Sequence, residues 1–468
     1  MRLKKPLIAA LLCTAIPVAA DAQIWEKFLR PGLSYRMQTD LLTPRLIHIL
    51  RYSPGSPFIR MVPEVAGGAV YALPEDGGRE TVSAMVQRTG AIAGLNADFF
   101  PFTGDPLGLM VRDGELLSRP DNRRIVFAWG KGASATARCV WTAKAEIAPG
   151  DSIEINGLNE ACGDNMLVLY TSSAKQVVSS APFTAIVVKS QDHGPWKPND
   201  SREVAITEIL ENQTAYVPPA DGFVLVARGT KATQAKRLRA GDPLKLIGQT
   251  SGLDWKKVDQ VVGGGPNLIT RGAINITAEM EGFKAGFITT RHPRTALGRT
   301  ARGEFLFVAI DGRQDMSDGC TLQELADIML NLSCTDAINL DGGGSTTLNL
   351  HGITVNRPSD GTERKVANAL LWFDSRPAPV SPLEYKIQPP APLAAGVVSQ
   401  LKVFTQRGFY VPNSEVIWSA TGDGWIDQGG GLRAMKEGSV SIQAWVRGKT
   451  LSLILPIAAP KVATPEQK

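Results

Sequence analysis

The chain of 468 residues is longer than one ordinary domain, so two or three domains are expected. Its 43% hydrophobic and 20% charged residues exclude an intrinsically disordered chain. The formal net charge of +5 comes without clustered basic and aromatic runs, so the sequence does not indicate nucleic-acid binding.

The N-terminus has the pattern of an export signal. Arg2, Lys4 and Lys5 precede an apolar run, and Ala20-Asp21-Ala22 forms a small-residue cleavage site. We therefore expect a signal peptide over residues 1–22 and a periplasmic or extracellular mature chain. The apolar run is too short to span a bilayer comfortably, and no other run reaches about 18 residues, so no transmembrane segment is expected in the mature chain.

The first site candidates follow a predicted strand and a predicted helix. Arg45–Tyr52 is typical of a strand, and residues 81–90 are typical of a helix. The small-residue strand that comes next ends in Asn96 and Asp98, which alternate with apolar neighbours and should share one face. They are either members of a functional site or anchors of a loop.

A long series of short alternating segments, residues 125–247, predicts a β-rich region. Cys139 and Cys162 flank a strand–turn–strand pattern within it, and export permits disulfides, so we expect a bridge between these two cysteines. The four cysteines of the mature chain lack the close pairing of a zinc site.

A basic loop precedes the central part of the chain. Residues 290–299 carry three arginines, among them Arg294, and a bidentate arginine is suited to a phosphate or a carboxylate. Taken alone, such a loop is more often a solvated surface.

The central segment, residues 305–350, gives the strongest signal. The apolar run Phe305–Ile310 predicts a buried strand, Thr321 and Glu324 form a capping box that opens a helix, and Ala337–Leu340 predicts a second strand. A strand–helix–strand unit makes the two strands parallel, so Asp311 and Asp341 should lie at the same sheet edge. Strand spacings of about 4.8 or 10 Å suit paired-carboxylate chemistry on sugars. The alternative is that both aspartates only cap glycine-containing turns.

The C-terminal part predicts a separate unit. A proline-rich linker over residues 375–382 follows a presumed catalytic domain of residues 23–374, and short strands over 383–460 favour an immunoglobulin-like β-sandwich. Residues 461–468 are expected to be disordered. The fold class predicted for the whole is α+β or mixed α/β, with a mixed core sheet, packed helices and a β-rich subdomain.

Five motifs in chain order resemble the phosphodiester glycosidase family over roughly residues 33–373: Asn96–Phe100, Gly263–Asn267, Pro293–Gly298, Asp311–Arg313 and Asn339–Ser345. The resemblance implies hydrolysis of the bond between a sugar's anomeric carbon and a phosphodiester oxygen. The residues at matching positions are Asn96, Arg294, Thr295, Asp311, Gly312, Asp341, Gly342, Gly343, Gly344 and Ser345. Asp98 departs from the family pattern, in which glycine often stands there.

These observations predict a secreted glycosidase that acts on a sugar-phosphodiester or a polysaccharide. Asp311, Asp341 and Asp98 are its catalytic candidates, and the substrate-binding candidates are Asn96, Arg294, Thr295, Gly312, Arg313, Gly342, Gly343, Gly344 and Ser345. The alternatives are a glycosidase acting on a phosphate-free exopolysaccharide and a non-catalytic envelope polysaccharide-binding protein. The sequence indicates no required cofactor; clustered aspartates can bind Ca²⁺ or Mg²⁺, but no ligand spacing identifies a metal site.

Overall fold

The computed structural model describes residues 23–460 except 41–42, 72–76, 102 and 378–380. The predicted signal peptide and C-terminal tail, and part of the predicted linker, lie outside the described residues. Within them, 50% of the chain is strand and 9% is helix. The prediction of an α+β or mixed α/β fold is therefore wrong: the fold is mostly β.

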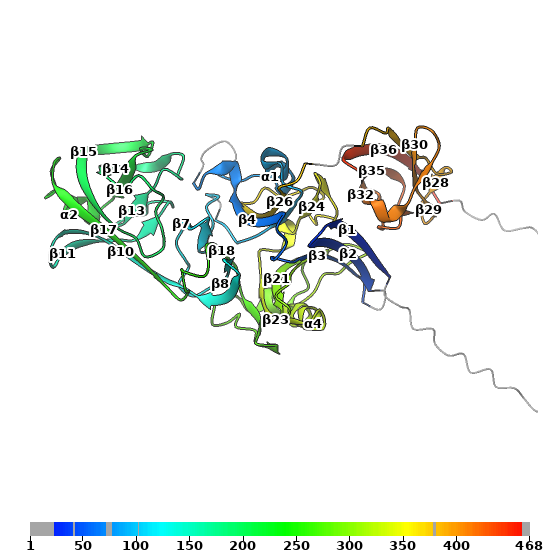
Figure 1. The fold of residues 1–468 in the computed structure, drawn as a ribbon, viewed down its shortest axis with the longest axis horizontal. Coiled ribbons are helices and arrows are strands. Elements are labelled where there is room, and N and C mark those ends of the chain that lie inside the picture. Colours follow the sequence, from blue (N-terminus) through cyan, green and yellow to red (C-terminus); the bar gives the residue numbers. More distant parts are fainter. Residues whose placement is uncertain (1–22, 41–42, 72–76, 102, 378–380, 461–468) are drawn as a thin grey trace, which may run out of the picture.

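The central sheet has eight strands in the order β1-β2-β3-β22-β21-β23-β19-β20 (Figure 1). Its strands are β1 (Ile24–Arg30), β2 (Leu33–Asp40), β3 (Arg45–Tyr52), β19 (Asn267–Thr270), β20 (Ala273–Ile274), β21 (Arg294–Thr300), β22 (Phe305–Ile310) and β23 (Cys334–Asn339). Each face of β22 meets a different core cluster: Phe305 and Phe307 belong to one, and Leu306 and Val308 to the other. Burial on both faces explains the uninterrupted apolar run of this strand.

The predicted strand–helix–strand unit exists, but its two strands are not neighbours. Helix α4 (Leu322–Asn331) begins with the expected capping box of Thr321 and Glu324 and connects β22 to β23. Both strands pair antiparallel with β21, which lies between them. Strands β21 and β22 are consecutive in the chain and pair as a hairpin, so β21 occupies the place beside β22. The connection through α4 therefore crosses over β21 to reach β23. The parallel direction of β22 and β23 is preserved, whereas their direct pairing is not.

A second, five-stranded sheet packs against the central sheet; we call it the facing sheet. Its order is β25-β24-β5-β26-β4, formed by β4 (Ile59–Val65), β5 (Ala93–Asn96), β24 (Leu348–Leu350), β25 (Ile353–Thr354) and β26 (Asn368–Asp374). Helix α1 (Val82–Thr89) packs on this sheet, whereas α4 and the short helix α3 (Ala285–Thr289) pack on the core of the central sheet (Figure 1). This small helical contribution is what the predicted fold class overestimated.

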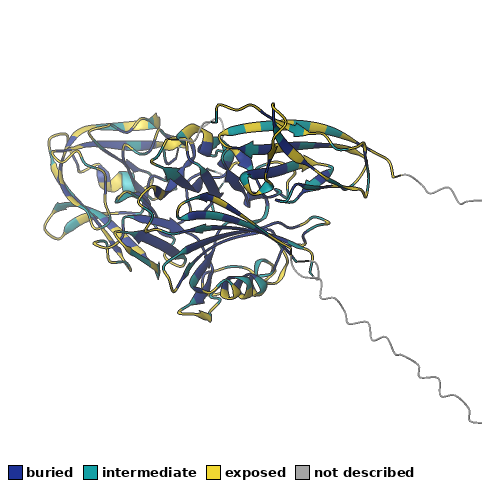
Figure 2. Ribbon diagram, turned by 45° about the vertical axis from the view of Figure 1, so that its right-hand side comes forward, coloured by how far each residue is buried: buried dark blue, intermediate teal, exposed yellow. Residues whose placement is uncertain are grey.

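The interface between the two sheets is an apolar core (Figure 2). Phe307 of β22 and Trp372 of β26 are fully buried. Their ring centres lie 4.6 Å apart, and the angle between the ring planes is 83°. An edge-to-face pair of this kind adds about 0.5–1.5 kcal/mol beyond its area burial. The contact fixes the position of β22, and hence of the sheet edge where β22 ends.

The β-rich region forms two further sheets, with a small helix, α2 (Thr230–Ala235). The bridging sheet has the order β7-β6-β18-β8-β9, and the outer sheet, at the left of Figure 1, has the order β11-β10-β17-β15-β14-β16-β13-β12. Their strands are β6 (Met110–Arg112), β7 (Glu115–Ser118), β8 (Ile125–Gly130), β9 (Ala133–Arg138), β10 (Val140–Ala148), β11 (Asp151–Ile155), β12 (Gly157–Leu158), β13 (Leu167–Tyr170), β14 (Val177–Ser190), β15 (Ser201–Tyr216), β16 (Gly222–Ala227), β17 (Pro243–Ser251) and β18 (Gln260–Gly263).

The predicted disulfide is not formed. Cys139 and Cys162 are free and buried, and they belong to separate core clusters. The expected strand–turn–strand pattern is real in β10 and β11, but the chain then crosses to β12 at the opposite edge of the outer sheet. Cys162 follows β12, so it is carried away from Cys139, which precedes β10. Burial raises the pKa of both thiols to about 12.

The C-terminal unit, in orange and red in Figure 1, consists of short strands around a core of its own. They form three sheets, β27-β30-β31, β28-β36-β35-β32 and β29-β34-β33. The strands are β27 (Tyr385–Gln388), β28 (Leu393–Ala394), β29 (Val398–Gln400), β30 (Lys402–Thr405), β31 (Tyr410–Val411), β32 (Val416–Gly422), β33 (Gly424–Ile426), β34 (Gly431–Ala434), β35 (Gly438–Val446) and β36 (Lys449–Ala458). A β-rich unit is present, and its immunoglobulin-like type stays a prediction. No helix in the described part of the chain is long and apolar enough to cross a membrane.

Replacing Phe307 by alanine should destabilise the fold by about 3–5 kcal/mol, because it leaves a cavity between the two sheets and removes the contact with Trp372. The measurement is the free energy of unfolding from urea denaturation. Phe28, which lies in the same sheet but is 74% exposed, provides the matched control, and Phe28→Ala should change stability by less than about 0.5 kcal/mol. Equal losses in the two variants would contradict the assignment of Phe307 to the core.

Candidate functional site

Three strand ends meet at one edge of the central sheet. Arg294, the first residue of β21, lies opposite Ile310, the last residue of β22, and Ala296 lies opposite Asn339, the last residue of β23. Asp311 and Asp341 follow these two strand ends, so both aspartates and Arg294 lie at the same edge, as the sequence predicted. Since β21 separates β22 from β23, those two strands are about 10 Å apart.

Asn96 joins the facing sheet to this edge. Its fully buried side chain donates from Nδ2 to the Asp341 carbonyl at 2.7 Å. Its Oδ1 accepts from the Thr295 hydroxyl at 2.9 Å and from the Thr347 amide at 3.1 Å. Asn96 and Thr295 are therefore brought together as the sequence predicted, and their bonds position the backbone of Asp341.

Asp341 is the accessible carboxylate of the site. The residue is half-buried, and its Oδ1 accepts from the Gly342 amide at 2.9 Å. Burial raises the pKa of the Asp341 carboxyl to about 6. The Ser345 hydroxyl and the Gly342 amide oppose this rise, as do the charges of two arginines, Arg364 and Arg124. A carboxyl group that titrates near pH 6 can exist in either protonation state close to neutrality.

Asp98 is 1% exposed and lies in a cradle of two glycines. Its oxygens accept from the amides of Phe99 at 2.8 Å and Gly108 at 2.7 Å. A Cβ at Gly263 would lie 2.3 Å from Oδ2 of Asp98, and a Cβ at Gly108 would lie 2.6 Å from it, so only glycine fits at either position. Burial raises the pKa of Asp98 to about 6, and the charge of Asp341 contributes to the rise. The aspartate that departs from the family pattern is thus electrostatically linked to Asp341.

Asp311 is enclosed by contacts from other parts of the chain. It is 1% exposed, and its carboxylate accepts from the Arg357 amide at 3.0 and 3.1 Å and from Nδ2 of Asn356 at 3.1 Å. Nε2 of His48 lies 3.5 Å away, and Nδ1 of the same ring is hydrogen-bonded to the Tyr35 hydroxyl at 2.7 Å. These contacts surround the carboxylate, which makes Asp311 suited to holding the 356–357 segment in place.

Most of the groups that were expected to bind phosphate already form hydrogen bonds within the protein. Arg294, 1% exposed, donates from Nε to the Cys320 carbonyl and from Nη2 to the carbonyls of Phe287 and Thr290. Burial lowers its pKa to about 10, which leaves it charged at neutral pH. The amides of Gly342 and Gly343 are also taken, by Oδ1 of Asp341 and the Pro293 carbonyl.

The glycines of the site allow loops to approach one another closely. A Cβ at Gly312 would lie 2.7 Å from the Pro293 nitrogen, and one at Gly342 would lie 2.8 Å from the Pro293 oxygen. Gly343 has φ +60° and lies beneath the Arg313 guanidinium, and Gly344 lies beneath the ion pair of Arg364 and Asp360. Ser345 is fully buried in the same turn. The backbone turns that these glycines permit bring arginine side chains over the loop that follows Asp341.

Residues 201–373 match the model of the phosphodiester glycosidase family. This stretch contains the Asp311 and Asp341 strand ends whose geometry is described above. Over these residues the chain is similar to phosphodiester glycosidases. Asn96 and Asp98 lie before the matched residues, so for these two the structure, and not the family match, provides the connection to the site.

Two curated proteins resemble short parts of the chain. The SPbeta prophage-derived protein YomE of Bacillus subtilis is 36% identical over 83 residues, which cover 18% of this chain and 13% of that protein. N-acetylglucosamine-1-phosphodiester alpha-N-acetylglucosaminidase of Bos taurus is 38% identical over 74 residues, which cover 16% of this chain and 14% of the bovine enzyme. The likeness to each thus spans about a seventh of the relative's length.

A crystal structure of a hypothetical protein from Synechocystis has a similar fold. The two structures superpose with a TM-score of 0.64 at 23% sequence identity, over 76% of this chain and 64% of that chain. The similarity of fold therefore extends well beyond the residues that match the family model.

Sequence reasoning missed several residues of the site. Arg124 was not among the candidates, although its charge acts on both Asp98 and Asp341. His48 and Arg357 contact Asp311 from distant parts of the chain, and no local pattern marks such contacts. For Arg124 the available signal was weak: it ends a short polar loop, residues 119–124, just before the buried strand β8.

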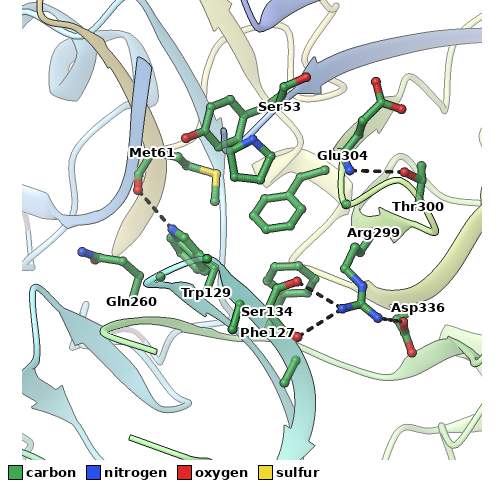
Figure 3. Close-up of a pocket in the computed structure, with 18 of the residues that line it drawn as sticks. Ser53, Met61, Phe127, Trp129, Ser134, Gln260, Arg299, Thr300, Glu304 and Asp336 are labelled. Carbon is green, nitrogen blue, oxygen red and sulfur yellow. Dashed lines mark hydrogen bonds and ion pairs between the residues drawn. The ribbon is translucent and has the colours of Figure 1, made fainter. Parts of the chain in front are cut away.

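The described residues contain no group of three or more His, Cys, Asp or Glu side chains with the geometry to hold a metal ion. A cavity of about 1450 Å³ lies at the other end of the central sheet (Figure 3). It is lined by Arg299 and Asp336, which form an ion pair at 2.9 Å, and by Phe127, Trp129 and Glu304. Arg299 lies near the end of β21 and Asp336 near the start of β23, so this cavity is remote from the strand ends that carry the site.

Gly263→Ala should destabilise the fold by about 1–3 kcal/mol, because the new Cβ would collide with the Asp98 carboxylate and would lie 2.9 Å from the Gly108 Cα. The midpoint of urea denaturation measures the change. Gly55→Ala is the control, since no atom lies within 4 Å of its added Cβ, and it should shift stability by less than about 0.5 kcal/mol. Similar stability in the two variants would show that the Asp98 cradle is not closely packed.

Proposed function

We propose that the protein is an exported hydrolase that cleaves the bond between a sugar's anomeric carbon and a phosphodiester oxygen. The observation that carries the proposal is Asp341: a half-buried carboxyl with a pKa raised to about 6, within the residues that match the phosphodiester glycosidase family, at the edge where β21, β22 and β23 meet. Raised carboxyl pKa values of this kind occur preferentially at functional sites. The activity for which the bovine relative is named supports the class of reaction.

In this proposal Asp341 acts on the substrate in its ionised form. It either removes a proton from the water that attacks the anomeric carbon or attacks that carbon itself. The C1–O bond breaks, and the phosphate departs with the bonding electron pair. Because a phosphate is a good leaving group, its protonation is less important than activation of the nucleophile. Asp98 is nearly inaccessible, so it serves as a positioning residue, and its carboxylate holds the amides of Phe99 and Gly108.

Asp341→Asn should reduce kcat on a sugar-1-phosphodiester by about 10²–10⁴-fold, because asparagine can accept the Gly342 amide but cannot accept a proton. The assay is a turnover screen of the purified mature chain on UDP-GlcNAc and other sugar-1-phosphodiesters, with and without EDTA. Asp336→Asn, at the other end of β23, is the control and should retain near-native turnover. An Asp341→Asn variant with native kcat would remove this residue from the mechanism.

The value of kcat/KM should rise with pH through about 6 and then reach a plateau, since it depends on ionised Asp341 in the free enzyme. Rates measured on one substrate between pH 4 and 8 test this. A rate that falls through the same pH range would instead make the protonated carboxyl the active form, with Asp341 as a general acid.

A further inference from the structure

The proposed reaction requires a cation beside the substrate's phosphate. Arg294 already donates to three carbonyls, and Arg364 is paired with Asp360 at 2.7 Å. Without a cation, a phosphate approaching Asp341 would meet two carboxylates and be repelled. Two further arginines remain: Arg313, which lies over Gly343 and is hydrogen-bonded to His292 at 3.1 Å, and Arg124.

Arg124 has the position and the unused donors for this task. Its guanidinium carbon lies 4.8 Å from the ring centre of Phe99 and 4.8 Å from that of Phe283. Phe99 directly follows Asp98 and donates its amide to the Asp98 carboxylate. Arg124 and the two rings therefore lie beside Asp98. The aromatic faces fix the plane of the guanidinium while keeping it charged.

Two nitrogens of Arg124 lack acceptors. Nε and Nη1 are buried and have no hydrogen-bond partner in the described part of the chain, and the nearest carboxylate oxygen, from Asp121, lies 3.8 Å from Nε. An unsatisfied buried donor costs about 1–3 kcal/mol, more when it is charged, and native structures retain few of them. The side chain is 19% exposed, and because Nε and Nη1 are buried, a ligand reaches the guanidinium from the side of Nη2.

We propose that Arg124 binds the phosphate of the substrate through the exposed side of its guanidinium. The inference rests on the proposed function and names the residue that selects an anionic substrate. Planar donors suit the bidentate geometry of a phosphate, which the point charge of a lysine does not reproduce. The charge of Arg124 also favours the ionised forms of Asp98 and Asp341, which is consistent with a position close to both carboxylates.

The test compares Arg124→Gln, Arg124→Lys and the control Arg123→Gln, whose arginine is 70% exposed and paired with Asp121 at 3.5 Å. Two substrates are used: UDP-GlcNAc, which carries phosphate, and the uncharged 4-nitrophenyl N-acetyl-α-glucosaminide. Binding of inorganic phosphate to each protein is measured by calorimetry, and thermal melting checks folding. Arg124→Lys keeps a cation between the rings, so it can be interpreted even if the glutamine variant does not fold.

Arg124→Gln should weaken phosphate binding and raise the KM for UDP-GlcNAc by about 10-fold or more, the loss expected for a charge-assisted hydrogen bond. Turnover of the uncharged substrate should change by less than about 3-fold, Arg124→Lys should be intermediate, and Arg123→Gln should match the native protein. Equal losses on both substrates, or phosphate binding as strong as in Arg123→Gln, would overturn the proposal and leave Arg124 as a clamp for the two rings. If the native protein hydrolyses neither substrate, the proposed function fails, and the phosphate titration still decides the role of Arg124.

Discussion

The site depends on one buried amide. The side chain of Asn96, at the end of β5 in the facing sheet, bonds to Thr295 of β21 and to the carbonyl of Asp341 after β23. Both acceptor sites of its Oδ1 are used, so the side chain has a single orientation. The two sheets are joined mainly by apolar packing, which is insensitive to direction, and elsewhere by directional contacts such as Arg30–Asp374 at 2.7 Å and Tyr52–Ile59 at 3.0 Å. At the site, the Asn96 amide makes their relative position specific and fixes the backbone of the residue that the proposed chemistry uses.

The charged residues around Asn96 are arranged so that the carboxyls of Asp98 and Asp341 titrate close to neutral pH. Asp98 and Asp341 lose water on folding, and this raises the pKa of each carboxyl to about 6. Nearby cations limit the rise without forming direct ion pairs with the two carboxylates among the described residues: Arg124 is held by rings, and Arg364 is held by Asp360. A direct ion pair would stabilise the ionised carboxyl and depress its pKa. Because the arginines are not paired directly with the two carboxyls, these carboxyls can exchange protons near neutral pH.

Local parts of the architecture could be predicted from the sequence, because short-range physics decides them. The capping box at Thr321, the strand Arg45–Tyr52 and the arrival of Asp311 and Asp341 at one edge follow from spacing and direction alone. Sheet order could not be predicted, since the insertion of β21 between β22 and β23 depends on hydrogen bonds between distant segments. The surroundings of the acidic candidates could not be predicted either, because they come from distant segments: Asp311 is enclosed by His48, Asn356 and Arg357, and Asp98 lies against Gly108 and Gly263.

Arg357 gives the C-terminal unit a part in this arrangement. Its amide donates to Asp311, and its guanidinium donates to the carbonyls of Gly424 at 3.0 Å and Gly422 at 2.6 Å, around the start of β33. One residue thus connects the carboxylate at the end of β22 with the backbone of a separately packed unit. The C-terminal unit therefore cannot be exchanged for another domain without loss of this contact. Any module grafted in their place must present two carbonyl oxygens to the same guanidinium, or the segment that encloses Asp311 loses its outer anchor.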